Sequence, residues 1–264
     1  MVDCKAQRVK LNSSLAAYLS MSASITQSPS SGASADQFRR SGYTLLPQAV
    51  SPESARLAAT YALLQQKWPG YYQSEEMFRV AFGRYADAFS EALLLELKPV
   101  VEQATGLELL PCYSYLRIYG NGAILPKHLD RPSCEISTSL TLGFRAPAAW
   151  PLCVHADGVD KPLSLMPGDM LIYRGADVPH WRETFSGEYW VQTFLHYVDA
   201  HGQFTDFKFD GRERIGPFDK LSMQRKFQRP ASLGQYDKPA TVGPDAPCPC
   251  GSGLRFRDCH GRKV

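Results

Sequence analysis

Residues 125–131 read Leu-Pro-Lys-His-Leu-Asp-Arg, and the triplet His128-Leu129-Asp130 within them decides how the rest of the chain is interpreted. In an extended strand, side chains two positions apart point to the same face, so the His128 imidazole and the Asp130 carboxylate can reach one metal ion. His180, which follows Val178-Pro179, offers a second imidazole. Two imidazoles and one carboxylate on one face of an octahedron leave three positions open, which suits an Fe(II) ion.

Short segments with the pattern of β-strands surround this triplet. Residues 113–119 are rich in aromatic and β-branched side chains, and 120–122 (Gly-Asn-Gly) form a turn signal. Residues 135–142 alternate with period two, as a half-buried strand does. Further strands are predicted at 150–154, 162–165 and 170–173, and another begins at 178–180. Four strands therefore separate Asp130 from His180, as a jelly-roll barrel requires before it returns to its start.

A second His-x-Asp pair, His155-Ala156-Asp157, competes with the first. Only two short strands fit between Asp157 and His180, and the pair lies where an apolar run gives way to Gly158, so a loop is the simpler interpretation. The first pair together with His180 is therefore favoured. The structural alternative is a buried barrel histidine near an unrelated surface aspartate.

Several segments together resemble the Fe(II)- and 2-oxoglutarate-dependent dioxygenase superfamily, most closely its prolyl-hydroxylase type. The resemblance extends over about residues 36–210. The segments that carry it are Tyr-Gly-x-Gly (119–122), Leu-Pro-x-His-x-Asp-Arg (125–131), Pro-Gly-Asp-x-Leu-Ile-Tyr (167–173), Pro-His-Trp-Arg-Glu (179–183) and an N-terminal entry strand at 38–47.

This resemblance implies a mainly β fold, a double-stranded β-helix (jelly roll) with flanking N-terminal helices, that holds Fe(II) through His128, Asp130 and His180. It also implies 2-oxoglutarate as co-substrate, with succinate and CO2 as products and hydroxylation of an unactivated C–H bond. Related halogenases lack the carboxylate ligand, so Asp130 favours hydroxylation.

The far carboxylate of 2-oxoglutarate needs a buried cation, and the planar guanidinium of arginine suits it. The family usually places a basic residue about ten positions after the second histidine, but residues 189–192 (Tyr-Trp-Val-Gln) contain none. Arg182 shares the inward face with His180 if the strand is regular, so it is the first candidate. Other candidates for this role are Arg117, then Arg131 and Arg174, with Tyr119 and Tyr113 as hydrogen-bond donors to the same carboxylate.

The C-terminal residues 247–264 carry a second metal pattern. Cys248-Pro-Cys250-Gly-Ser-Gly precedes Cys259-His260, and four such N and S ligands suit a tetrahedral Zn(II) site. The pattern resembles the SEC-C zinc motif. So short a module cannot bury a core, so zinc would supply its folding free energy. A flexible tail with reactive thiols is the alternative.

Length and composition predict one sizeable domain with appendages in a chain of 264 residues. We expect a mobile extension at 1–35, the β-helix domain at 36–226, a linker at 227–246 and the zinc motif at 247–264. Helices are predicted at 51–66 and at about 85–104, the second kinked or split by Pro99. No apolar run approaches the roughly 18 residues of a membrane span, and seven cysteines without a disulfide pattern favour a reducing, cytoplasmic location.

The remaining residues are expected to be structural. Cys112, Cys134 and Cys153 lie in apolar strands and are expected to be buried, and His196 and His201 to be structural or exposed. The net charge of +3 makes nucleic acid an unlikely partner, although the excess of 12 basic over 6 acidic residues in 207–264 makes this end of the chain basic.

The leading hypothesis is a hydroxylase for an amino acid or a related small metabolite. One alternative is the same chemistry on a protein or peptide side chain, for which the zinc tail would serve as a docking handle. Another is a non-catalytic barrel that the tail recruits to a protein partner.

Overall fold

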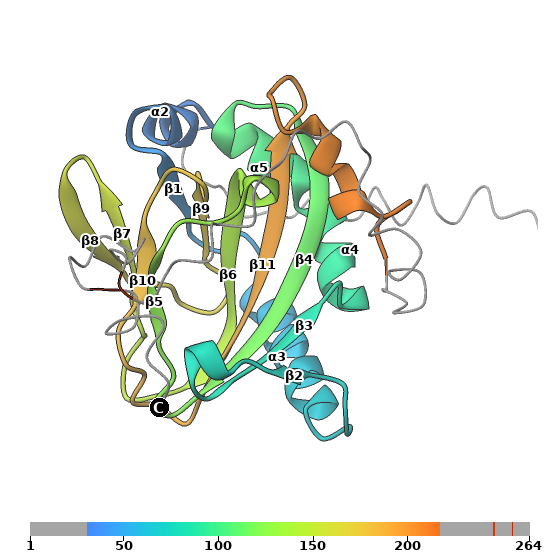
Figure 1. Cartoon of the computed structure of the whole chain (residues 1–264), viewed down its shortest axis with the longest axis vertical. Helices are drawn as coiled ribbons and strands as arrows, with labels where there is room; N and C mark the ends of the chain where they lie inside the picture. The colour runs from blue at the N-terminus through green and yellow to red at the C-terminus, as the bar shows by residue number, and fades with distance from the viewer. Residues whose placement is uncertain (1–30, 217–244, 246–254, 256–264) are drawn as a thin grey trace, which may run out of the picture.

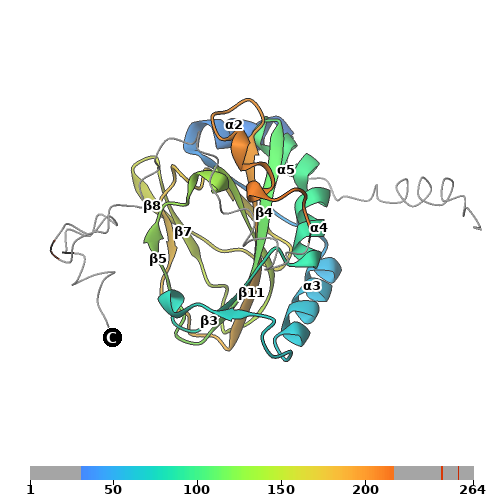
Figure 2. The same ribbon diagram turned by 45° about the vertical axis from the view of Figure 1, so that its right-hand side comes forward.

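The computed structural model describes residues 31–216 together with Asp245 and Arg255 (Figure 1). Two antiparallel sheets face each other, with helices against the outer side of the larger one (Figures 1 and 2). The mainly β jelly roll with N-terminal helices is therefore confirmed. Most of the predicted linker and all four proposed zinc ligands (Cys248, Cys250, Cys259 and His260) lie outside the described residues.

The smaller sheet has four strands in the order β5-β10-β7-β8. Strand β10 is paired with β5 on one side and β7 on the other, and this places His180 directly opposite His128. The strands span Leu125–His128 (β5), His180–Arg182 (β10), Leu152–Ala156 (β7) and Val159–Leu163 (β8).

The larger sheet has seven strands in the order β1-β9-β6-β11-β4-β3-β2. Its long central strands are rich in aromatic and β-branched residues, which pack well on a pleated surface. Strands β6 to β9 lie between β5 and β10 in the chain, so the predicted four strands between Asp130 and His180 are confirmed. The strands span Tyr43–Leu46 (β1), Met170–Tyr173 (β9), Ile136–Arg145 (β6), Tyr189–Asp199 (β11), Leu109–Gly120 (β4), Ala81–Tyr85 (β3) and Gln73–Ser74 (β2).

Two of the helices have clear starting signals. The Ser51 side chain accepts a hydrogen bond from the Ser54 N–H at the start of α3, and Asp87 does the same for two N–H groups of α4. The helix predicted at 85–104 is split, with Pro99 in the first turn of its second half, and it begins later because Tyr85 still belongs to β3. The helices span Ser31–Ser41 (α2), Pro52–Gln65 (α3), Ala88–Glu96 (α4) and Lys98–Thr105 (α5), with 3-10 turns at Glu76–Phe78, Pro132–Cys134 and Thr205–Gly211. None of the helices in the described residues is long and apolar enough to cross a membrane.

Helix α2 begins five residues before the domain start that we expected at residue 36. Ser34 and Ala35 of this helix are buried.

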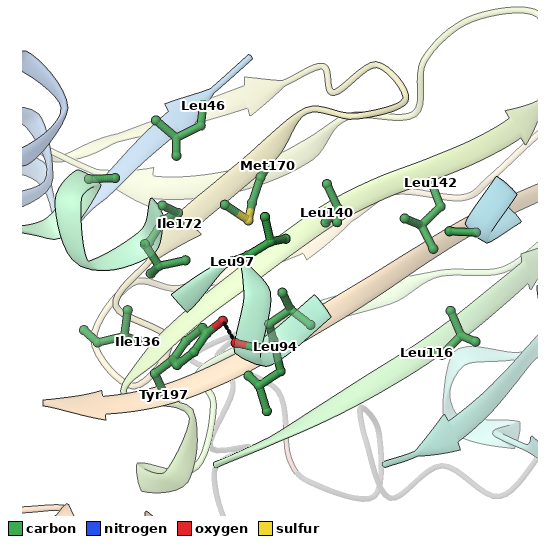
Figure 3. Packing of buried hydrophobic residues seen from close by; sticks show 14 of the residues in the cluster. Leu46, Leu94, Leu97, Leu116, Ile136, Leu140, Leu142, Met170, Ile172 and Tyr197 are labelled. Atoms are coloured by element: carbon green, nitrogen blue, oxygen red, sulfur yellow. Dashed lines mark hydrogen bonds between the residues drawn. The ribbon is translucent and has the colours of Figure 1, made fainter. Parts of the chain in front are cut away.

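The two faces of the larger sheet have different chemistry. Its outer face packs against the helices through an apolar cluster that includes Leu94, Leu116, Leu140 and Ile172 (Figure 3). The Tyr197 hydroxyl donates to the Leu94 carbonyl at 2.7 Å and links β11 to α4. The inner face carries polar and aromatic side chains instead, and it turns toward the smaller sheet.

Candidate metal centre

His128, Asp130 and His180 converge in the structure as predicted. Asp130 Oδ1 lies 3.5 Å from His128 Nε2 and 3.6 Å from His180 Nε2, and the two imidazole rings are 4.2 Å apart between centroids. One ligand atom from each residue lies within 4.8 Å of the others, close enough to hold a single ion. The strand pairing of β5 with β10 brings the two histidines together, and Asp130 follows β5 by two residues.

Backbone carbonyls orient both imidazoles. His128 Nδ1 lies 2.7 Å from the Pro126 carbonyl oxygen, and His180 Nδ1 lies 3.0 Å from that of Val178. Because a carbonyl only accepts, both Nδ1 atoms carry the proton, and the Nε2 lone pairs face the Asp130 carboxylate. Lone pairs and a negative charge that face one another at this distance call for a cation between them.

The protonation states suit a metal ion. Burial acts to raise the pKa of Asp130, but the neighbouring His128 and His180 side chains outweigh it and lower the pKa to about 2. Burial lowers the pKa of His180 to about 4 against the opposing effect of Asp130. At neutral pH the carboxylate is therefore ionised and the His180 imidazole is neutral, which are the forms that bind metals.

Residues that were not predicted to belong to the metal site surround Asp130. Its second oxygen, Oδ2, accepts a hydrogen bond of 3.0 Å from the Ser137 hydroxyl, and Ser137 Oγ lies 3.0 Å from His196 Nδ1. His196 is buried beside the metal ligands, whereas His201 is exposed and pairs with Glu108. The Tyr173 hydroxyl lies 3.5 Å from His180 Nε2. Only the inward alternation of their strands could have suggested these residues.

Arg182 is a buried cation without a counter-ion among the described residues. It is 1% exposed, and its guanidinium is stacked on Trp150 and Trp190, with 4.7 and 5.0 Å to the ring centroids. Its Nη1 donates to the Trp150 carbonyl and its Nη2 to Gln192 Oε1, while Nε has no partner. Gln192 belongs to the opposite sheet, so Arg182 points across the interior, as its position two residues after His180 predicted.

The other predicted anchor residues already have partners. Arg117 binds both carboxylate oxygens of Glu75 at 2.7 and 2.8 Å and donates to the Tyr119 hydroxyl. The Tyr113 hydroxyl lies 3.0 Å from Cys134 Sγ. Two further arginines point elsewhere: Arg131 pairs with Asp210, and Arg174 covers the ring of Phe38.

The competing pair His155 and Asp157 does not join the metal centre. His155 lies on strand β7 rather than in the loop that we expected, is partly exposed and hydrogen-bonds Asp160. Asp157 follows in a turn, with a φ of 55°, and pairs with Lys161. Cys112 and Cys134 are buried as expected, and Cys153 is partly exposed.

Two sequence comparisons each match a small part of the chain. A family model for the SEC-C motif matches residues 246–262, which contain the predicted zinc ligands. A stretch of 67 residues is 36% identical to the protein translocase subunit SecA of Herminiimonas arsenicoxydans. The match covers 25% of this chain and 7% of that protein.

Solved structures resemble the described domain. A Pseudomonas putida prolyl-4-hydroxylase aligns with a TM-score of 0.53 and 16% identity, over 64% of this chain and 98% of that one. The 2-oxoglutarate-dependent carbocyclase SnoK from nogalamycin biosynthesis gives 0.56 and 10%, over 71% and 92%. The epimerase SnoN, in complex with Fe3+, 2-oxoglutarate (alpha ketoglutarate) and nogalamycin RO, gives 0.52 and 13%, over 64% and 84%. The chain therefore has the fold of the Fe(II)/2-oxoglutarate oxygenases and carries a SEC-C motif near its C-terminus.

Proposed function

We propose that this protein is an Fe(II)- and 2-oxoglutarate-dependent oxygenase that hydroxylates an unactivated C–H bond. The convergence of His128, Asp130 and His180 carries the proposal, because two imidazoles and one carboxylate in this arrangement fit Fe(II). When bound, iron and 2-oxoglutarate would allow O2 to oxidise the substrate, while 2-oxoglutarate is converted to succinate and CO2. The structural neighbours include a hydroxylase, a carbocyclase and an epimerase. The shared fold therefore supports an oxygenase, and hydroxylation as its reaction is our proposal.

Arg182 is the proposed anchor for the far carboxylate of 2-oxoglutarate. Its unpartnered Nε and missing counter-ion are the features expected of a cation that awaits an anionic ligand. The flanking Trp150 and Trp190 keep water from the guanidinium and strengthen its attraction for a carboxylate. Arg117 is the weaker candidate, because Glu75 already neutralises it.

A free amino acid or a related small metabolite is the proposed substrate, and a protein or peptide side chain is the alternative. The SEC-C match supports a Zn(II) site at Cys248, Cys250, Cys259 and His260, and this tail could bind a protein partner. We propose that residues 227–246 link it to the catalytic domain. The cytoplasmic location stays a prediction.

The test of the function is turnover of 2-oxoglutarate. Purified protein with Fe(II), ascorbate and 2-oxoglutarate is incubated with a panel of amino acids, and succinate is measured. We expect succinate from the wild type and only the enzyme-free background from Asp130→Ala and His180→Ala. The double variant His155→Ala/Asp157→Ala removes the other His-x-Asp pair and should retain activity. Unchanged turnover in Asp130→Ala would refute the proposal.

Zinc in the tail has a separate test. Elemental analysis of the full chain, purified without added metal, should find about one zinc per chain from the four-ligand motif. Cys248→Ser/Cys250→Ser should lose it. Equal zinc content in both proteins would contradict the assignment.

A further inference from the structure

The two oxygens of Asp130 face different surroundings. Oδ1 faces the two Nε2 atoms of the metal centre, whereas Oδ2 faces strand β6 and the hydroxyl of Ser137. Ser137 Oγ is 3.0 Å from each of three atoms: Asp130 Oδ2, His196 Nδ1 and the Cys134 carbonyl oxygen. This buried hydroxyl is therefore the point at which the metal-facing carboxylate is joined to the larger sheet.

Donor and acceptor roles in this cluster follow from the chemistry of each group. A serine hydroxyl has one proton, and an ionised carboxylate is a stronger acceptor than a peptide carbonyl, so the Ser137 proton is directed to Asp130. A lone pair of Ser137 Oγ then accepts the Nδ1 proton of His196. The result is a chain of two hydrogen bonds that runs from His196 through Ser137 to Asp130.

The surrounding structure holds both His196 and Ser137 in place. His196 lies directly opposite Ser137 in the pairing of β11 with β6, and its ring is packed on Tyr113 with 4.4 Å between centroids. Gly175 packs against the same pair of groups, because a Cβ there would lie 2.5 Å from Asp130 Oδ2 and 2.6 Å from Ser137 Oγ. The backbone there closes the space into which the carboxylate could otherwise turn.

We propose that Ser137 and His196 are positioning residues that hold Asp130 with Oδ1 directed at the metal. The inference rests on the proposed function, because it concerns the same metal centre. Asp130, Cys134 and His196 also lie close enough to hold an ion. The Ser137 hydroxyl already bridges Asp130 and His196, however, so we interpret this set as support for one metal site rather than as a second site.

The test measures the dissociation constant for Mn(II) by electron paramagnetic resonance in the full chain. Mn(II) prefers oxygen and imidazole ligands, so the cysteine-rich tail competes weakly for it. Ser137→Ala and His196→Phe should weaken binding roughly 10- to 100-fold, the usual effect of losing a group that orients a metal ligand. His196→Asn should bind close to wild type, because its amide N–H replaces the Nδ1 donor.

The matched control is Thr138→Val, which removes a neighbouring buried hydroxyl of β6 that bonds the Leu195 N–H instead. It should lower stability without changing the Mn(II) dissociation constant. If the wild type binds Mn(II) and Ser137→Ala binds it within twofold, the positioning role is wrong while the metal centre stands. If the wild type binds none, both proposals fail. Should His196→Phe not fold, Ser137→Ala decides alone, since it removes one oxygen and adds nothing.

Discussion

Arg182 combines full burial with a positive charge that no carboxylate balances among the described residues. Burial lowers the pKa of its guanidinium to about 10, which still leaves it charged at neutral pH. An unpaired buried charge destabilises a folded protein by several kcal/mol unless a ligand neutralises it. The free protein should therefore be less stable than its complex with a carboxylate at this position.

Replacing Arg182 with methionine should separate these two effects. Without 2-oxoglutarate, Arg182→Met should unfold at the same temperature as the wild type or higher, because the desolvated charge is gone. With metal and 2-oxoglutarate at about 100 times the dissociation constant, the wild type should gain roughly 2.7 kcal/mol and the variant almost nothing. Thermal unfolding of both proteins with and without 2-oxoglutarate measures the stability of the free protein and the stabilisation by the ligand.

Arg117→Met is the matched control, because it removes another interior arginine. It should destabilise the free protein, since it leaves the Glu75 carboxylate without its partner, and it should keep the stabilisation by 2-oxoglutarate. The opposite result, with stabilisation lost in Arg117→Met and kept in Arg182→Met, would move the anchor to Arg117.

The predicted residues and the missed ones differ in how the chain brings them together. His128 and Asp130 are two positions apart, and His180 fits a familiar spacing, so the sequence alone predicted that these three side chains converge. Ser137 and His196 are 59 residues apart and meet only through strand pairing. Glu75, which neutralises Arg117, directly follows the short strand β2, which no sequence pattern marked.

At the scale of elements, the connection between β9 and β10 contacts both Asp130 and His180 of the proposed metal centre. The Gly175 carbonyl accepts a hydrogen bond from the Asp130 N–H at 2.9 Å. Three residues later, the Val178 carbonyl orients the His180 imidazole. This connection thus sets the position of a carboxylate ligand and the tautomer of an imidazole ligand at once.

Gly175→Ala should disturb this connection. The new Cβ would lie 2.4 Å from the Cys134 carbonyl, 2.5 Å from Asp130 Oδ2 and 2.6 Å from Ser137 Oγ, so the backbone must shift. We expect a loss of about 1–3 kcal/mol in the free energy of unfolding, as for other overpacked sites, together with weaker Mn(II) binding. Urea denaturation and metal titration measure the two effects.

Gly32→Ala provides the control for this substitution. Gly32 lies in helix α2, and a Cβ there meets nothing within 4 Å, so the change should be neutral or slightly stabilising. Wild-type stability and metal affinity in Gly175→Ala would show that the connection does not constrain Asp130.

The predicted elements were most accurate where local patterns decide them. Residues 170–173 form β9 with the expected bounds, and Ser51-Pro52 marks the start of α3. The helix predicted from residue 85 begins at Ala88 instead, because pairing with β4 keeps Tyr85 in a strand. A tertiary contact overrides local preference there.

At the scale of the whole molecule, the fold places its apolar core and its polar centre on opposite faces of one sheet. The outer face packs against the helices, and the inner face buries histidines, an arginine and hydroxyl groups between the sheets. Alternation along residues 135–142 predicted a half-buried strand, whereas most of β6 is buried on both faces. Long-range pairing decides which strands become neighbours. Only the strand order typical of a jelly roll could have suggested these neighbours from the sequence.

The two buried histidines should make the metal-free protein sensitive to acid. Burial lowers the pKa of both His180 and His196 to about 4. Between about pH 6.5 and 4 the unfolded chain therefore binds two protons that the folded chain excludes, so stability falls as the pH falls. Each histidine should contribute a slope of about 1.4 kcal/mol per pH unit in this window.

Urea denaturation of chelator-treated protein at pH 7, 6 and 5 measures this slope. His196→Asn should lower the slope of stability against pH by the contribution of one proton, because the substituted amide does not titrate. A slope that is the same in the wild type and in His196→Asn would show that His196 does not titrate as its burial predicts.

A crystal structure of the full chain with Mn(II) and 2-oxoglutarate would locate both the metal ion and its co-substrate. We expect one Mn(II) ion at about 2.0–2.3 Å from His128 Nε2, Asp130 Oδ1 and His180 Nε2, with the far carboxylate of 2-oxoglutarate on Arg182. An ion bound elsewhere in the barrel, or none bound while these three side chains keep their present positions, would contradict it.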